Sequence, residues 1–117
     1  MPIISGTMAK SVEMVRQMRL TNAEFCFIKE KTDVLKHAAQ GFGYSVEIQN
    51  DQIILCVDRL EYSVEIRILS DDNLTGLPAV IMSVRSSKLF QSLFLDEIAD
   101  RECKEFFKNL FSIVAYA

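Results

Sequence analysis

Apolar and polar residues alternate most clearly in the middle of the chain. Tyr44, Val46 and Ile48 alternate with polar residues, which is the period-two pattern of a strand with one buried face. Segment 52–58 is an almost continuous apolar run, and segment 60–69 alternates again. Short runs of this kind, separated by pairs of polar residues, predict consecutive antiparallel strands joined by tight turns.

Two-residue turns at Asn50-Asp51 and at Asp58-Arg59 would fix the register of these strands. The predicted pairs are Ile48 with Ile53, Val46 with Leu55, Tyr44 with Val57, Val57 with Leu60, Leu55 with Tyr62, and Ile53 with Val64. In this register the apolar positions share one face, whereas a slip by one residue would mix the two faces. We therefore expect that face to contribute the core.

The chain after these strands has a loop composition over 70–78 and then a further strand pattern. Ala79–Arg85 places Val80, Met82 and Val84 on one face, as a fourth strand would. Ser86–Leu95 fits either a helix or a short fifth strand, because runs of this length satisfy both periods.

The C-terminal segment, from Asp96 to about Tyr116, has the pattern of an amphipathic helix. Its apolar stripe consists of Leu95, Ala99, Cys103, Phe106, Phe107, Leu110, Ile113 and Val114. Asp96, Glu97 and Asp100 stand in the first turns and lysines follow them, which suits the helix dipole. We expect this stripe to pack on the apolar sheet face.

A second helix is predicted before the sheet. Thr21 and Glu24 have the spacing of a capping box, and the helix they begin could run to Gln40, before Gly41 and Gly43. Its apolar face would contain Phe25, Ile28, Leu35 and Ala39. The alternative is an interruption at Thr32-Asp33 with a strand over Glu24–Ile28.

The first twenty residues are predicted to be less regular. Met8, Val12 and Val15 have the spacing of a short helix capped by Thr7, and residues 1–6 are expected to be a flexible terminus. Together the patterns predict one α+β domain over 1–117. It would contain a four- or five-stranded antiparallel meander, one or more N-terminal helices, and a C-terminal helix on one sheet face.

Composition narrows the function classes. The 117 residues are half apolar and carry a net charge of −3 with dispersed basic residues, so nucleic acid is an unfavoured partner. Apolar runs are too short to span a membrane, and the first residues lack the pattern of a secretory signal. Three cysteines, an odd number, suggest free thiols and a cytoplasmic location.

The residues best suited to catalysis do not form a motif. The single histidine, His37, is predicted to be solvent-exposed, away from the apolar helix face. Cys26 and Cys103 are predicted to pack in the core, and Cys56 to lie on the polar sheet face, where its reactivity is worth testing. With one histidine and no Cys-x-x-Cys pair, the sequence predicts no zinc site.

Carboxylates and glycines lead to the same conclusion. Glu47, Glu61 and Glu65 project from the polar sheet face, but the predicted register sets Glu47 opposite Ile54 and Glu61 opposite Cys56, so they are dispersed. Asp71-Asp72-Asn73 with Gly76 lacks the spacing of a calcium loop. The glycines do not have phosphate-loop spacing either. We therefore predict no catalytic, cofactor-binding or metal-binding residues.

The remaining signal is a surplus of apolar side chains. Ile54 and Cys56 interrupt the polar sheet face, and Phe90, Phe94 and Phe111 lack assigned positions in the core. Apolar surface of this kind favours association, so we expect a homodimer formed through a sheet face, a sheet edge or the C-terminal helix.

The function expected from these patterns is a non-enzymatic protein-interaction module that self-associates. The alternative is a small-ligand-binding protein or enzyme with a pocket between sheet and helices. Tyr44, Tyr62 and Met82 could line such a pocket.

Overall fold

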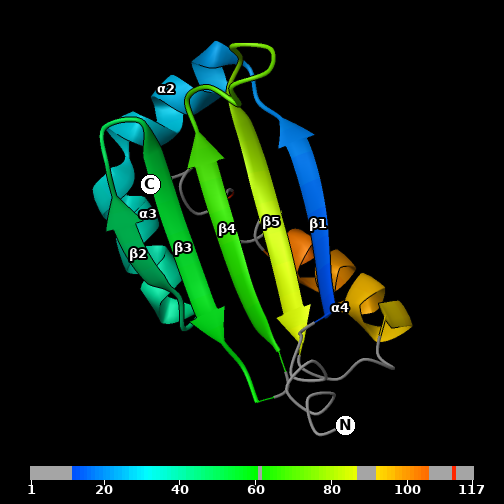
Figure 1. Ribbon diagram of the computed structural model, residues 1–117. Helices are drawn as coiled ribbons and strands as arrows, with labels where there is room; N and C mark the ends of the chain where they lie inside the picture. The colour runs from blue at the N-terminus through cyan, green and yellow to red at the C-terminus, as the bar shows by residue number, and fades with distance from the viewer. Residues whose placement is uncertain (1–11, 61, 87–91, 106–111, 113–117) are drawn as a thin grey trace, which may run out of the picture.

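The computed structural model describes residues 12–60, 62–86, 92–105 and 112. Its elements are β1 (Val12–Arg19), α2 (Asn22–Glu30), α3 (Thr32–Gly41), β2 (Ser45–Ile48), β3 (Gln52–Asp58), β4 (Ser63–Leu69), β5 (Ala79–Ser86) and α4 (Ser92–Lys104). The five strands form one antiparallel sheet in the order β1-β5-β4-β3-β2. The three helices lie behind the sheet in Figure 1, which confirms the predicted α+β fold.

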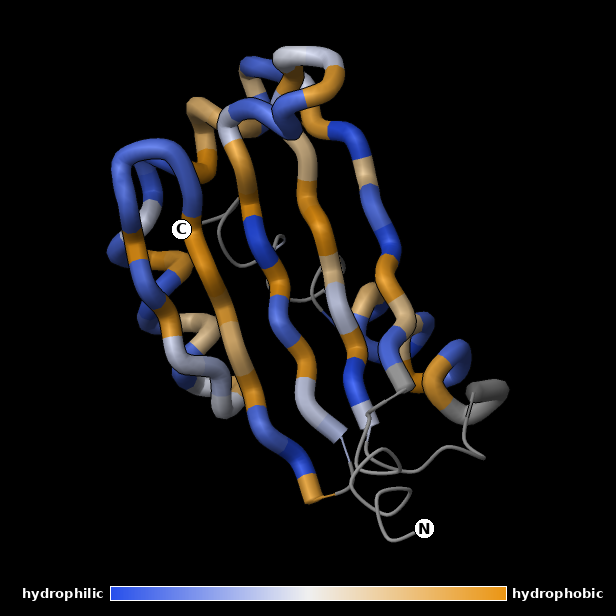
Figure 2. The backbone as a smooth tube through the Cα atoms, in the orientation of Figure 1, coloured by the Kyte–Doolittle hydropathy of each residue, from blue (hydrophilic) through white to orange (hydrophobic). Residues whose placement is uncertain are grey.

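The core lies between the helices and the covered face of the sheet. Its largest side chains include Ile28 and Leu35 from the helices and Ile53, Leu55 and Ile66 from the strands, all fully buried. Each contributes about 1.5–3 kcal/mol by leaving water. Figure 2 shows the pattern behind this arrangement: β3 is hydrophobic along most of its length, and β4 alternates.

The first predicted turn is confirmed and the second is displaced. Ile48 pairs with Ile53, and the Gln49 amide donates to the Gln52 carbonyl across the Asn50-Asp51 turn. The second predicted turn, at Asp58-Arg59, is wrong. The chain reverses between Arg59 and Tyr62, where the Arg59 amide donates to the Tyr62 carbonyl.

This displacement moves β4 along β3 by four positions. Val57 therefore faces Val64 rather than Leu60, Leu55 faces Ile66 rather than Tyr62, and Ile53 faces Ile68 rather than Val64. Because four is an even number, the side chains keep their faces, and the predicted core face survives the error. Leu60, which was placed in a strand, is instead 99% exposed at the turn.

The segment around Val12 and Val15 is a strand rather than the predicted short helix. β1 pairs with β5 over eight consecutive residues, from Val12 opposite Ser86 to Arg19 opposite Ala79. Thr7, Met8 and the expected flexible terminus over 1–6 lie outside the described residues. The meander predicted from β2 to β5 is confirmed, and β1 adds the fifth strand beside β5.

The predicted capping box is confirmed. Thr21 Oγ1 accepts a 3.0 Å hydrogen bond from the Glu24 amide, and Glu24 Oε1 accepts from the Thr21 amide at 2.8 Å. The helix is interrupted at Lys31, one residue before the predicted alternative break, and both segments are helical. Gly43, with φ of +89°, follows the end of α3, as the glycine signal predicted.

Arg16 of β1 forms ion pairs that hold α4 against this strand. Its guanidinium lies on the covered face and pairs with Asp96, at 2.6 Å, and with Asp100, both on α4. These hydrogen bonds, with that to Asp100 the stronger, raise the pKa of Arg16 above its ordinary value. The predicted helix from Asp96 is confirmed to Lys104 and begins earlier, at Ser92; its predicted continuation lies almost entirely outside the described residues.

Candidate functional site

The face of the sheet that none of the described helices covers, called here the open face, carries the two strand residues predicted to form an interaction surface. Ile54 and Cys56 lie on β3, both partly exposed. Ile54 stands between Glu47 of β2 and Arg67 of β4, and Cys56 between Ser45 and Glu65. The register therefore isolates these apolar side chains among polar neighbours, as the sequence pattern predicted.

Two further apolar residues of the open face were not singled out from the sequence. Ile81 of β5 faces Arg67 from the side opposite Ile54, and Val15 of β1 faces Ser83. Val15 is 55% exposed. The alternation over Ala79–Arg85 could have identified Ile81, whereas Val15 was hidden because its segment was predicted to be a helix.

The charged side chains of the open face largely neutralise one another. Arg67 Nε contacts Glu65 Oε1 at 2.9 Å, and Arg85 Nη2 contacts Glu13 Oε2 at 2.8 Å. Glu47 accepts a hydrogen bond from Gln49, and Glu61 lies outside the described residues. Within the described part of the chain no group of three or more metal-ligating side chains forms. Glu47 faces Ile54 as predicted, but the predicted pairing of Glu61 with Cys56 is wrong, because the displaced β4 sets Glu65 opposite Cys56.

Cys56 borders a hollow of about 150 Å³ on the open face, together with Glu65, Ser83 and Arg85. Burial and the neighbouring Glu65 raise the pKa of its thiol. Because the thiolate is the nucleophilic form, this environment lowers the reactivity of Cys56 at neutral pH.

A network of polar side chains around Glu102, which the sequence analysis did not predict, reaches into the core. Glu102 of α4 is 2% exposed, and its Oε2 accepts a 2.6 Å hydrogen bond from the Tyr44 hydroxyl. Tyr62 donates to Glu102 Oε1 at 3.3 Å and accepts from Arg101 Nη2 at 3.0 Å. Arg59 Nε lies 3.9 Å from the same Oε1.

This Glu102 network holds three parts of the fold together. Arg59 Nη2 also donates to the carbonyl of Phe42, so the network links α4, the β3–β4 turn and the end of α3. Burial, followed by the hydrogen bond to Glu102, raises the pKa of Tyr44 and keeps its hydroxyl protonated. Tyr44 and Glu102 are both almost completely buried, and their hydrogen bonds stabilise the packing of α4.

The three residues predicted to line a ligand pocket between sheet and helices, Tyr44, Tyr62 and Met82, instead contact side chains of α4. Tyr44 and Tyr62 converge on Glu102, and Met82 lies with its sulfur 3.7 Å from the Cys103 thiol. The signal for Glu102 was present in the sequence. It follows Leu95 and Ala99 at helical spacing, so an acid stands within an apolar stripe.

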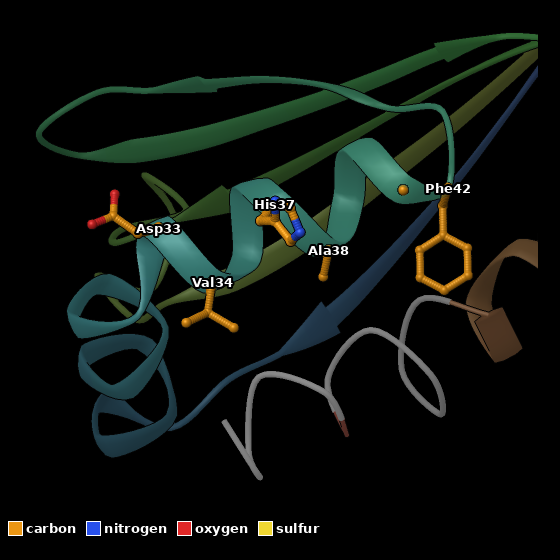
Figure 3. A pocket seen from close by; sticks show the side chains of 6 residues that line it. Asp33, Val34, His37, Ala38 and Phe42 are labelled. Atoms are coloured by element: carbon orange, nitrogen blue, oxygen red, sulfur yellow. The ribbon is translucent and has the colours of Figure 1, made fainter.

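A shallow groove of about 610 Å³ lies along α3 (Figure 3). Val34, Ala38 and Phe42 form its apolar part, and Asp33, His37 and Gly41 complete it. His37 is exposed, as predicted. The groove has the chemistry to hold an apolar side chain or a small apolar molecule next to one imidazole.

The other predicted residues have different outcomes. Cys103 is partly buried against the core, which confirms its prediction, and burial raises the pKa of its thiol. The prediction for Cys26 is wrong: it is exposed, because α2 directs Ile28 rather than Cys26 to the core. Phe90 and Phe111 lie outside the described residues; Phe94 belongs to α4, but its side chain is not described.

In the segment Ser86–Leu95, for which helix and strand were both predicted, the structure assigns Ser86 to β5 and the last four residues to α4.

Among the helices described, none combines the length and apolarity needed to cross a membrane. The chain matches no protein-family model, no curated protein and no solved structure.

Proposed function

We propose that the chain is a non-enzymatic protein-interaction module that self-associates and offers its open face to a protein partner. The observation that carries this proposal is the one-sided sheet. Helices cover one face, while the other displays Val15, Ile54, Cys56 and Ile81 among paired charges. Mixed apolar and neutralised polar surface is typical of non-obligate protein interfaces.

The thiols support a cytoplasmic setting for this module. Cys26, Cys56 and Cys103 are all unpaired, and Cys26 is exposed. An accessible free thiol is compatible with a reducing compartment.

Affinity capture from the native cell, followed by mass spectrometry, tests partner binding. Ile54→Lys places a charge among the apolar side chains of the open face, on β3, and should remove the specific partner. Leu60→Lys is the matched control, because Leu60 is fully exposed at the β3–β4 turn. Equal capture by both variants, or a wild-type protein that sediments as a monomer at micromolar concentration, would contradict the proposal.

A second candidate function is small-ligand binding in the α3 groove, which is favoured by its apolar lining next to His37. A screen of small apolar and aromatic acids by NMR would show shifts confined to α3 and to Phe42, which follows it. Ala38→Trp, which fills the groove, should abolish them, and shifts that persist in this variant would exclude the groove as the site.

A further inference from the structure

The edge of the sheet formed by β1 differs from the edge formed by β2. β1 is eight residues long and is paired without interruption to β5, whereas β2 has four residues. The chain beyond β2 is also tied back, since Lys29 Nζ donates to the carbonyls of Gln49 and Asn50. Short edges resist pairing with another strand, and long regular edges invite it.

The hydrogen-bond pattern shows which backbone groups of β1 face outward. The Leu20 amide donates to the Pro78 carbonyl at 3.1 Å, in register with the β1–β5 ladder. Because bonded residues alternate along an antiparallel ladder, Met14, Arg16 and Met18 also bond to β5. The amide and carbonyl groups of the intervening residues, Glu13, Val15, Gln17 and Arg19, therefore point to the free edge.

Exposed apolar side chains gather at this edge. In the described residues, seven large apolar side chains are exposed. Val15, at 55%, and Met18, at 43%, lie on opposite faces of β1. Leu74 and Leu77 belong to the loop whose carbonyl at Leu77 accepts from Arg19. Four of the seven thus lie on β1 or in the loop beside its end.

The usual protections of an edge strand are weak in β1. It contains neither proline nor lysine, and its ladder has no bulge. The inward charge of Arg16, which could deter pairing, is neutralised by Asp96 and Asp100 of the same chain. Among the described strands β1 thus forms an edge that is open to another strand.

We infer that β1 pairs with β1 of a second copy, antiparallel and centred on Arg16, to join two sheets into one. This inference rests on the proposed self-association and names its surface. The pairing sets Glu13 opposite Arg19 and Val15 opposite Gln17 on the open face, and Met14 opposite Met18 on the covered face. Each pair occurs twice because a two-fold contact is self-complementary. Opposite charges meet at both ends.

Gln17→Pro tests the edge directly. Its amide points to the free edge, so proline removes a donor to the second copy without removing a bond to β5. Two symmetric hydrogen bonds are lost, and the dimer dissociation constant measured by sedimentation equilibrium should rise about tenfold or more. Ile48→Pro is the matched control at the β2 edge, where the Ile48 amide also faces outward by the same alternation, and it should leave the constant unchanged.

A cross-linking experiment tests the register without a proline. In a Cys26→Ser background, Val15→Cys and Gln17→Cys proteins should form a disulfide-linked dimer when mixed and oxidised, because residues opposite each other in a ladder lie within bridging distance. Absence of the mixed dimer would overturn the proposed pairing.

The outcomes separate the two proposals. A dimer that persists in Gln17→Pro but is lost in Ile54→Lys keeps the self-associating module and overturns the β1 contact. A wild-type monomer at micromolar concentration overturns both. Loss of the dimer in Gln17→Pro, with thermal unfolding close to that of Ile48→Pro, supports the β1 contact.

Discussion

Tyr44 and Glu102 are joined by a 2.6 Å hydrogen bond in the core, although 58 residues separate them in the chain. The tyrosine lies between α3 and β2 and the glutamate stands on α4, so the bond connects α4 to the segment that follows α3. A buried carboxylate needs such donors, because an unpartnered charge in the core costs several kcal/mol.

Tyr44→Phe should lower the free energy of unfolding by about 1–3 kcal/mol, because Glu102 loses its shortest hydrogen bond. Glu102→Leu in the Tyr44→Phe background should restore part of that loss, since an apolar pair leaves less polar surface unsatisfied. Urea unfolding of the four proteins of this double-mutant cycle measures the coupling. Additive effects would show that the two side chains do not act together.

The same hydroxyl predicts a pH dependence. Because burial raises the pKa of Tyr44 in the folded state, its stabilisation is complete below the ordinary phenol pKa of about 10 and declines as the pH rises beyond it. The difference in unfolding free energy between wild type and Tyr44→Phe should therefore shrink above pH 10. A difference that stays constant from pH 8 to pH 11 would contradict this assignment.

The hydrogen bonds of Asp72 predict that the stability of the fold decreases at acidic pH. Its carboxylate accepts hydrogen bonds from the amides of Thr75 and Leu74 and from Arg19, and these lower its pKa, with the Thr75 amide the largest cause. The stabilisation is present above the ordinary Asp value of about 4 and is lost as the pH falls below it. Asp72→Asn should be less stable than wild type at pH 7, and the two should converge towards pH 2. Asp71→Asn is the milder control, because it removes a charge while its amide oxygen can still accept the hydrogen bond from the Asn73 amide.

Gly43 and Gly41 form a matched pair at the end of α3. Gly43 has a positive φ, so Gly43→Ala should destabilise the fold by about 1 kcal/mol. Gly41 is helical, and a Cβ there meets no atom within 4 Å; Gly41→Ala should therefore stabilise by about 0.4–1 kcal/mol. Thermal unfolding of both variants gives the comparison, and a shift of the same sign in both would contradict it.

The three thiols should react at different rates. Cys26 is exposed, while burial raises the pKa of Cys56 and Cys103. Iodoacetamide at neutral pH should therefore modify Cys26 first, as followed by peptide mass spectrometry. In urea, where the chain is unfolded, the three cysteines should react at similar rates. If Cys56 reacted first under native conditions, the open face would contain a reactive thiol.

The faces of the central strands were predictable because local alternation determines them, and the Asn50-Asp51 turn was placed correctly. The second turn was not, because Leu60 extends the apolar alternation into a loop. β1 was missed because Arg16 interrupts its inner apolar row. That charge is accommodated only by Asp96 and Asp100, about eighty residues further along the chain. The buried position of Glu102 was missed for a similar reason, because its partners Tyr44, Tyr62 and Arg59 lie in other elements, distant in the sequence.

The pairing of the first strand with the last also sets an order for folding during synthesis. Arg19 pairs with Ala79, so about sixty residues must be translated before β1 meets β5. At 5–20 residues per second this takes roughly 3–12 seconds. The β2–β3–β4 hairpins, closed by short turns, can form as soon as they leave the ribosome. β1 is therefore expected to join last, and until then it is free to bind a chaperone or a neighbouring nascent chain.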